Sequence, residues 1–253
     1  LRLTLQTDTK IMSEFCIKRM DSVRLFNTFY SSQLFHDVQM SGLFSDSKTF
    51  ADAQPLFDLT AIMKQYEANK NTAAFKISEF VQQNFSIPSV DEIIGNVPKT
   101  NVNEHIESLW PLLCKNPTKQ DNDSLLPLAH PYIVPGGRFR EIYYWDSYFT
   151  ALGLIESGRV DIATAMLENF IDLITQYNII PNGNRSYYLS RSQPPVLALF
   201  VKLLLPFHQG DSVFLKRCVN AIKKEHQFWM RDSELLSPEQ SALSRVVRLC
   251  DGS

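Results

Sequence analysis

The stretch WDSYFTALGLIESGRVDIATAMLENFIDLITQY, residues 145–177, indicates the fold class of this chain. Its second half, residues 161–177, carries apolar side chains at helical spacing along one face. Its first half, residues 145–156, has the same spacing and stops at Ser157-Gly158, a pair that suits a helix end. Two helices joined by so short a turn predict a helical hairpin. The apolar positions of the second helix are Ile162, Met166, Phe170, Leu173, Ile174 and Tyr177.

Aromatic side chains form a stripe along the first helix. Trp145, Tyr148 and Phe149 recur at helical spacing and are continued by Leu152 and Ile155. A stripe of this kind is more often packed in a core than presented to a ligand. We therefore expect Tyr148 and Phe149 to lie in the core.

Further helical patterns occupy residues 72–85, 103–109, 196–207 and 211–230. No clear run of alternating apolar and polar residues suggests a sheet. The sequence thus predicts a mostly α-helical protein.

Residues 178–195 are rich in turn formers and form a connection too long for a simple link between two helices, which favours a functional loop.

Composition excludes several classes of function. The chain has 253 residues, of which 44% are hydrophobic and 21% charged, so it can bury a full core. A formal charge of −2 gives no broad positive field, which argues against nucleic acid as a partner. The four cysteines form no CxxC pair and the five histidines are dispersed. We therefore expect no metal and no cofactor.

Two stretches combine glycine turns, arginines and aromatic rings. They are PGGRFREIYYWDSYF, residues 135–149, and IPNGNRSYYLSRSQPP, residues 180–195. A sugar offers a C–H face to aromatic rings and a rim of hydroxyls to guanidinium, amide and carboxylate groups. A phosphate loop would continue into Lys or Ser/Thr, and Gly136-Gly137-Arg138 does not. The two stretches together predict a carbohydrate site.

Some of the polar residues in and near these stretches have an equally simple structural interpretation. Glu141 or Asp146 could form an ion pair with Arg138 rather than bind a ligand. His130 and His208 are expected to be ordinary histidines with satisfied polar groups rather than catalysts.

The quoted stretches resemble a known family. Residues 135–149 are similar to the first signature of the trehalases, the glycoside hydrolases of family 37 that split α,α-trehalose, and residues 180–195 resemble a later signature of that family. DSKTFAD, residues 46–52, resembles an early segment of it. The resemblance implies an (α/α)6 barrel, incomplete in this chain. It divides the chain into an N-terminal extension (1–24), part of the catalytic domain (25–230) and a divergent tail (231–253).

The resemblance also implies which residues contact trehalose. The aromatic rings of Phe139 and Trp145 would face the pyranose rings, and Asp146 would accept from sugar hydroxyls. The remaining contacts would come from arginine, amide and hydroxyl groups. The implied substrate-binding residues are Arg138, Phe139, Trp145, Asp146, Asn182, Arg191, Ser192 and Gln193.

Trehalases invert configuration, which requires a general acid and a general base. The resemblance places both carboxylates in later segments, and this sequence contains neither the Arg-Pro-Glu nor the Gln-Trp-Asp motif associated with them. Two interpretations follow: the N-terminal part of a genuine trehalase, or a truncated product that binds sugar or a partner without turnover. Another (α/α)6 enzyme would require a different first motif.

The cellular location has only indirect signals. No run approaches the roughly 20 apolar residues that span a bilayer. Family resemblance favours an extracellular or membrane-tethered protein, with a cytoplasmic one as the alternative.

Overall fold

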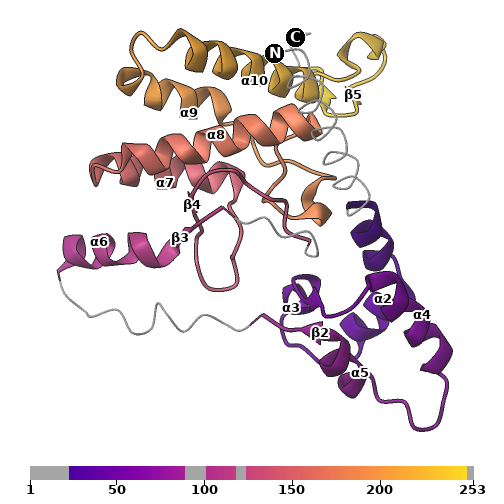
Figure 1. Ribbon diagram of the computed structural model, residues 1–253. Coiled ribbons are helices and arrows are strands. Elements are labelled where there is room, and N and C mark those ends of the chain that lie inside the picture. Colours follow the sequence, from indigo (N-terminus) through magenta and orange to yellow (C-terminus); the bar gives the residue numbers. More distant parts are fainter. Residues whose placement is uncertain (1–22, 89–100, 118–123, 250–253) are drawn as a thin grey trace, which may run out of the picture. The chain divides into compact units, whose positions relative to one another are not determined.

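The computed structural model describes residues 23–88, 101–117 and 124–249, and these are predominantly helical (Figure 1). The predicted all-α class is confirmed. The described residues divide into two compact units. Unit 1 comprises residues 23–88, 124–127 and 185–187, and unit 2 comprises residues 101–117, 128–184 and 188–249.

The strands are short antiparallel pairs of two residues each. In unit 1, β1 (Gln54–Pro55) pairs with β2 (Phe85–Ser86). In unit 2, β3 (Cys114–Lys115) pairs with β4 (Tyr132–Ile133), and β5 (Ala242–Leu243) pairs with β6 (Val246–Val247). Pairs this short join loops and form no sheet layer of their own.

Unit 1 is built from short helices that begin at polar residues. The side chains of Ser32, Asp46 and Asp58 each accept a hydrogen bond from a backbone N–H in the first turn of the helix that follows. The core between the helices is rich in aromatic residues, among them Phe29 and Phe50. The helices are residues 23–30, α2 (Gln33–Met40), α3 (Ser47–Ala51), α4 (Leu59–Asn69) and α5 (Ile77–Asn84).

Helix α5 begins later than the sequence pattern predicts. The predicted helix starts at residue 72, but residues 72–75 form a turn in which Phe75 N–H donates to the Thr72 carbonyl at 3.0 Å. Thr72 Oγ1 also donates to the Asn69 carbonyl at 2.8 Å. Threonine side chains compete with the backbone in this way, and they favour turns over helix interiors.

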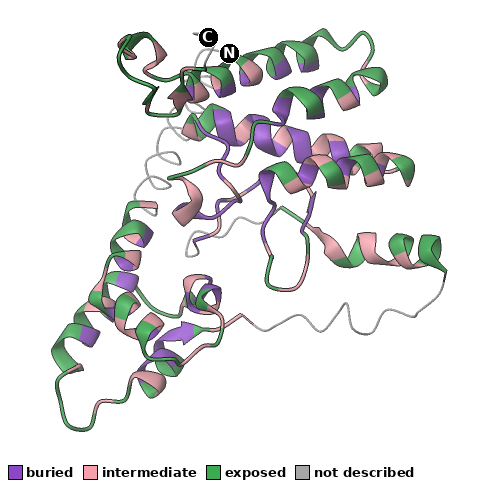
Figure 2. Ribbon diagram, turned by 180° about the vertical axis from the view of Figure 1, so that it is seen from behind, coloured by how far each residue is buried: buried purple, intermediate pink, exposed green. Residues whose placement is uncertain are grey.

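Unit 2 is organised around one central helix. Helix α8 (Val160–Tyr177) contacts α7 (Tyr144–Glu156), α9 (Leu197–Leu204) and α10 (Ser212–Trp229). Figure 1 shows these four helices side by side, and Figure 2 shows buried residues concentrated along α8. The predicted hairpin is therefore confirmed as α7 and α8. The remaining helices are α6 (Val102–Leu113) and the 3-10 turns η2 (Ser186–Tyr188), η3 (Leu205–Phe207) and η4 (Ser233–Leu235), of which η2 begins in unit 1.

The face of α7 that packs in the core is not the predicted one. Its buried residues are Tyr144, Ser147, Ala151 and Leu154. Phe149 is 57% exposed, so the prediction that it lies in the core is wrong, and Tyr148 is only half-buried. Both faces of α7 carry apolar side chains, and tertiary packing selects the one that meets α8 and α9.

A buried hydrogen-bond node fixes the start of α7. The Tyr144 hydroxyl accepts from the backbone N–H groups of Val196 at 3.0 Å and Leu197 at 2.7 Å. It donates to the Glu225 carboxylate of α10. Burial raises the pKa of Glu225, and the hydrogen bond from Tyr144 partly opposes that shift. The node ties α7, α9 and α10 together within unit 2.

Replacing Glu225 by glutamine is expected to raise the melting temperature at about pH 8 and to change it little at about pH 4. The folded pKa of Glu225 is raised, so its contribution to stability is full below the unfolded pKa and is lost as pH rises through the folded pKa. Glutamine stays neutral and can still accept from Tyr144. Thermal unfolding followed by circular dichroism across this range measures the effect, and an equal shift at every pH would contradict it.

None of the helices in the described ranges has the combination of length and apolarity needed to cross a membrane.

Candidate functional site

The first glycine stretch closes on itself as a tight reversal. Gly136 N–H donates to the Phe139 carbonyl at 3.2 Å, and Phe139 N–H donates to the Gly136 carbonyl at 3.1 Å. Gly136 and Gly137 have φ values of 95° and 60°, a backbone region that glycine adopts without strain. The reversal leaves the side chains of Arg138 and Phe139 exposed.

The second stretch runs antiparallel to the end of the first. Tyr144 N–H donates to the Asn182 carbonyl at 3.0 Å, and Ile142 N–H donates to Asn184 Oδ1 at 3.0 Å. Gly183 lies between these contacts, where a Cβ atom would come within 3.0 Å of the Ile142 carbonyl oxygen. A larger residue at this position would push the two chains apart by a few tenths of an ångström.

Gln193 joins the second stretch to the start of α7. Its Oε1 accepts from Trp145 N–H at 3.1 Å, and its Nε2 lies 3.4 Å from Asp146 Oδ2. Asn182 N–H donates to the Arg191 carbonyl at 3.2 Å, which folds the loop back on itself. These bonds bring five of the eight predicted residues into one network.

Ser192 Oγ donates to the Gln193 carbonyl at 3.1 Å. Aromatic rings lie beside Arg138, Phe139 and Arg191. Phe139 meets Tyr143 edge-on at 5.5 Å between centroids, and Tyr143 meets Tyr188 at 5.8 Å. The guanidinium of Arg138 lies 5.5 Å from the Phe139 centroid, and that of Arg191 lies 5.0 Å from the Tyr188 centroid. Tyr143 and Tyr188 were not predicted as site residues, although both lie inside the quoted stretches.

The eight predicted side chains are accessible. Arg138, Phe139, Trp145 and Arg191 are exposed, with Trp145 at 41%, and the other four are half-buried. Asn182 Oδ1 is buried and accepts no hydrogen bond from the described residues.

Glu141 has a structural position. Its side chain is fully buried, and it accepts from the Tyr143 hydroxyl at 3.0 Å. Burial, followed by the charge of Glu141, raises the pKa of Tyr143. The tyrosine is therefore neutral. The Glu141–Tyr143 pair is buried and stabilises the first glycine stretch instead of facing solvent.

Of the two histidines expected to be structural, His208 is packed against its neighbours, whereas the His130 side chain is 41% exposed and its Nε2 lies 3.9 Å from Asp172 Oδ2. The His208 ring stacks on Phe214 at 4.0 Å between centroids and lies 3.0 Å from Thr164 Oγ1 through its Nε2. The backbone of His130 exchanges two hydrogen bonds with the Asn169 side chain, at 3.0 and 2.9 Å.

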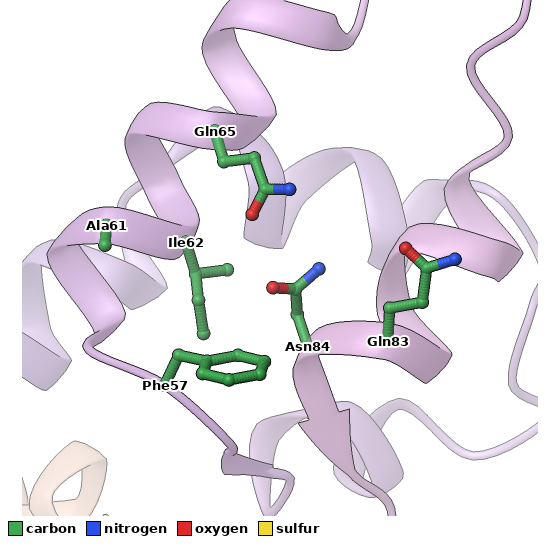
Figure 3. A pocket seen from close by; sticks show the side chains of 6 residues that line it. All are labelled: Phe57, Ala61, Ile62, Gln65, Gln83 and Asn84. Atoms are coloured by element: carbon green, nitrogen blue, oxygen red, sulfur yellow. The ribbon is translucent and has the colours of Figure 1, made fainter.

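Among the residues that the structure describes, no cluster of three or more His, Cys, Asp or Glu side chains could hold a metal ion. Unit 1 contains an open hollow of about 520 Å³, shown in Figure 3. It includes none of the predicted sugar residues, and no charged side chain lines it. The lining residues are Phe57, Ala61, Ile62, Gln65, Gln83 and Asn84.

Comparison with known proteins identifies the family. A family model described as Trehalase matches residues 42–251, which includes most of the predicted tail. Proteins named periplasmic trehalase from Escherichia coli strain 55989 / EAEC and Shigella flexneri serotype 5b strain 8401 are each 49% identical over 221 residues. Those alignments cover 87% of this chain and 39% of each relative, so the chain spans about two-fifths of their length.

Solved structures are also similar in sequence, and the following is one of them. Neutral trehalase Nth1 from Saccharomyces cerevisiae is 46% identical, over 44% of this chain and 21% of that chain, with a TM-score of 0.40. The family match covers most of the chain, and the two stretches that resemble trehalase signatures form one connected network. The chain belongs to the trehalase family.

Proposed function

We propose that this chain carries part of the trehalose-binding site of an α,α-trehalase, an inverting glycoside hydrolase that produces two glucose molecules. The observation that carries the proposal is the convergence of the two motif stretches through Gln193, which contacts both Trp145 and Asp146. Family membership and the names of the relatives support the choice of trehalose as substrate.

Each side chain has a chemical role in this proposal. Phe139 and Trp145 supply apolar ring faces for the pyranose C–H groups. Asp146 accepts from sugar hydroxyls, and the Asn182 amide holds another hydroxyl. The remaining polar groups donate to or accept from the rim of hydroxyls. They are Arg138, Arg191, Ser192 and Gln193.

Hydrolysis needs groups beyond this network. Inversion requires an acid and a base roughly 6.5–9.5 Å apart, with a water between the base and the sugar. Glu141 is buried and paired with Tyr143, and Asp146 is engaged by Gln193, so neither carboxylate is assigned to proton transfer. We assign both catalytic roles to carboxylates outside these 253 residues, and the hairpins α7–α8 and α9–α10 to part of an (α/α)6 barrel.

The alternative function is a product that binds sugar or a partner without turnover. A chimaera separates the two: this chain replaces the matched segment of the E. coli periplasmic trehalase, whose remaining sequence is kept. Glucose release by the chimaera supports a segment of a working trehalase. A folded chimaera that binds trehalose but releases no glucose supports the non-catalytic product.

We also propose a location outside the cytoplasm. The support is the name of the bacterial relatives, which are called periplasmic. Fractionation of the native source, with detection by an antibody against this chain, tests the proposal.

The 253-residue chain alone is expected to bind trehalose and to release no glucose from it. Binding without a positioned acid and base leaves the barrier to cleavage almost unchanged. Isothermal titration, together with tryptophan fluorescence, to which the exposed Trp145 contributes, measures binding. A coupled glucose assay measures turnover. Maltose, which differs in its linkage, serves as the control ligand. Absence of trehalose binding contradicts the proposed site, and glucose above the blank contradicts the assignment of the catalytic groups.

A further inference from the structure

The stretch DSKTFAD, residues 46–52, has a defined place in unit 1 but no role among the sugar contacts. Asp46 caps α3 through a hydrogen bond from Lys48 N–H at 2.9 Å, and Phe50 is fully buried in the aromatic core. The Lys48 ammonium pairs with the carboxylate of Asp52 one turn later. Asp52 is only 2% exposed, and Lys48 is at the edge of burial. A buried ion pair at this position requires an explanation beyond capping.

Asp52 is the centre of a buried network that reaches the sugar loop. Its Oδ1 accepts from the Tyr187 hydroxyl at 2.8 Å and lies 3.6 Å from Arg185 Nε. Arg185 is itself buried and donates through Nη1 to Ser124 Oγ at 2.8 Å. All these groups belong to unit 1.

Further contacts fix the same three loop residues. Ser186 N–H donates to the Ser124 carbonyl at 2.7 Å. The Tyr187 ring meets Tyr30 edge-on at 5.4 Å, and the Tyr30 hydroxyl donates to the Ala51 carbonyl at 3.1 Å. Residues 185–187 are thus held by charge, hydrogen bonds and ring packing at once.

The held residues lie in the middle of the loop that contains Asn182, Arg191 and Gln193. Tyr188 follows Tyr187 directly, its carbonyl accepts from Arg191 N–H at 3.1 Å, and its ring lies under the Arg191 guanidinium. The geometry points to Asp52 as a positioning residue for this loop: by holding Tyr187 and Arg185, it sets Tyr188 and through it Arg191. The consequence for sugar binding rests on the proposed function.

The physical advantage is preorganisation. A loop of this length loses backbone freedom when a ligand orders it, and that loss subtracts from affinity. Fixing its centre in advance divides it into two shorter segments, so less freedom remains to be lost on binding. DSKTFAD is then the motif that supplies the anchor.

Tyr187→Phe tests the inference, because it removes the hydroxyl bonded to Asp52 and keeps the ring that packs on Tyr30. The expected result is a trehalose Kd raised roughly 3- to 10-fold. Amide hydrogen exchange at Asn182 and Arg191 is expected to accelerate by a similar factor, because both donate within the loop.

Tyr66→Phe is the matched control. It also removes a tyrosine-to-aspartate hydrogen bond in unit 1, from Tyr66 to Asp37. The hydrogen bonds and ring contacts of these two residues are made with partners other than residues 185–187. It is expected to change neither the trehalose Kd nor exchange in the loop. If the two variants change the Kd and the loop exchange equally, the Asp52 network only stabilises unit 1 in general, and the inference is overturned.

The exchange measurement separates this inference from the proposed function. If the unsubstituted chain binds no trehalose, the sugar site is refuted, while faster loop exchange in Tyr187→Phe still supports the anchor. If the unsubstituted chain binds trehalose and Tyr187→Phe leaves Kd and loop exchange unchanged, the anchor is refuted and the sugar site stands.

Discussion

Replacing Asp52 by alanine is expected to lower the free energy of unfolding of unit 1 by about 3–5 kcal/mol, because it removes the buried carboxylate that pairs with both Lys48 and Arg185. A loss of that size is a large part of the total stability of an ordinary domain. Hydrogen exchange of the α3 and α4 amides as a function of urea measures it.

Asp58→Ala is the comparison for this effect. Asp58 is an exposed aspartate in the same unit, and it caps α4 through a hydrogen bond from Ala61 N–H at 2.8 Å. Losing a cap of this kind costs about 0.5–2 kcal/mol. If Asp52→Ala costs no more than Asp58→Ala, the buried network does not hold unit 1 together.

Arg138→Lys is expected to raise the Kd for trehalose roughly 10- to 150-fold, which corresponds to about 1.5–3 kcal/mol. Lysine keeps the charge but loses the planar fork that can contact two hydroxyls, as well as the guanidinium packing on Phe139. The affinity is measured by titration calorimetry with trehalose.

Arg159→Lys is the matched control for this substitution. Arg159 is also a surface arginine of unit 2, and it pairs with Glu107 at 3.0 Å rather than with the two motif stretches. It is expected to change the Kd less than about twofold, since an exposed ion pair contributes little. Comparable losses in the two variants would show that Arg138 acts through general stability rather than through contact with the sugar.

The helices of unit 2 could be predicted from local pattern. Helices α8 and α10 match the predicted ranges to within a residue, and Gly158, with φ 70°, follows α7 as the sequence indicates. The spacing of side chains along a helix is set by the helical backbone itself. A long amphipathic helix can therefore be recognised in the sequence without knowing which segments pack against it. In unit 1 the sequence pattern predicted α5 alone, and the helix at residues 23–30, α2, α3 and α4 were not predicted.

The buried face of α7 could not be predicted in the same way. Periodicity locates an apolar stripe, but α7 has apolar residues on two faces, and the aromatic one containing Trp145 and Phe149 is the exposed one. Each large aromatic side chain, considered by itself, suggests a buried position. Only the position of α8 and α9 decides which face is covered.

The sequence by itself determined the helical class, the trehalase resemblance and the eight residues proposed to contact sugar. The tertiary structure decided how the stretches connect: Gln193 contacts Trp145 and Asp146 across nearly fifty residues, and Tyr187 donates to Asp52 across 135. Helical spacing is a local property that each segment carries alone. Contacts between distant segments depend on how chain reversals and packed faces bring them together, and that information is spread over the whole fold rather than written in any one motif.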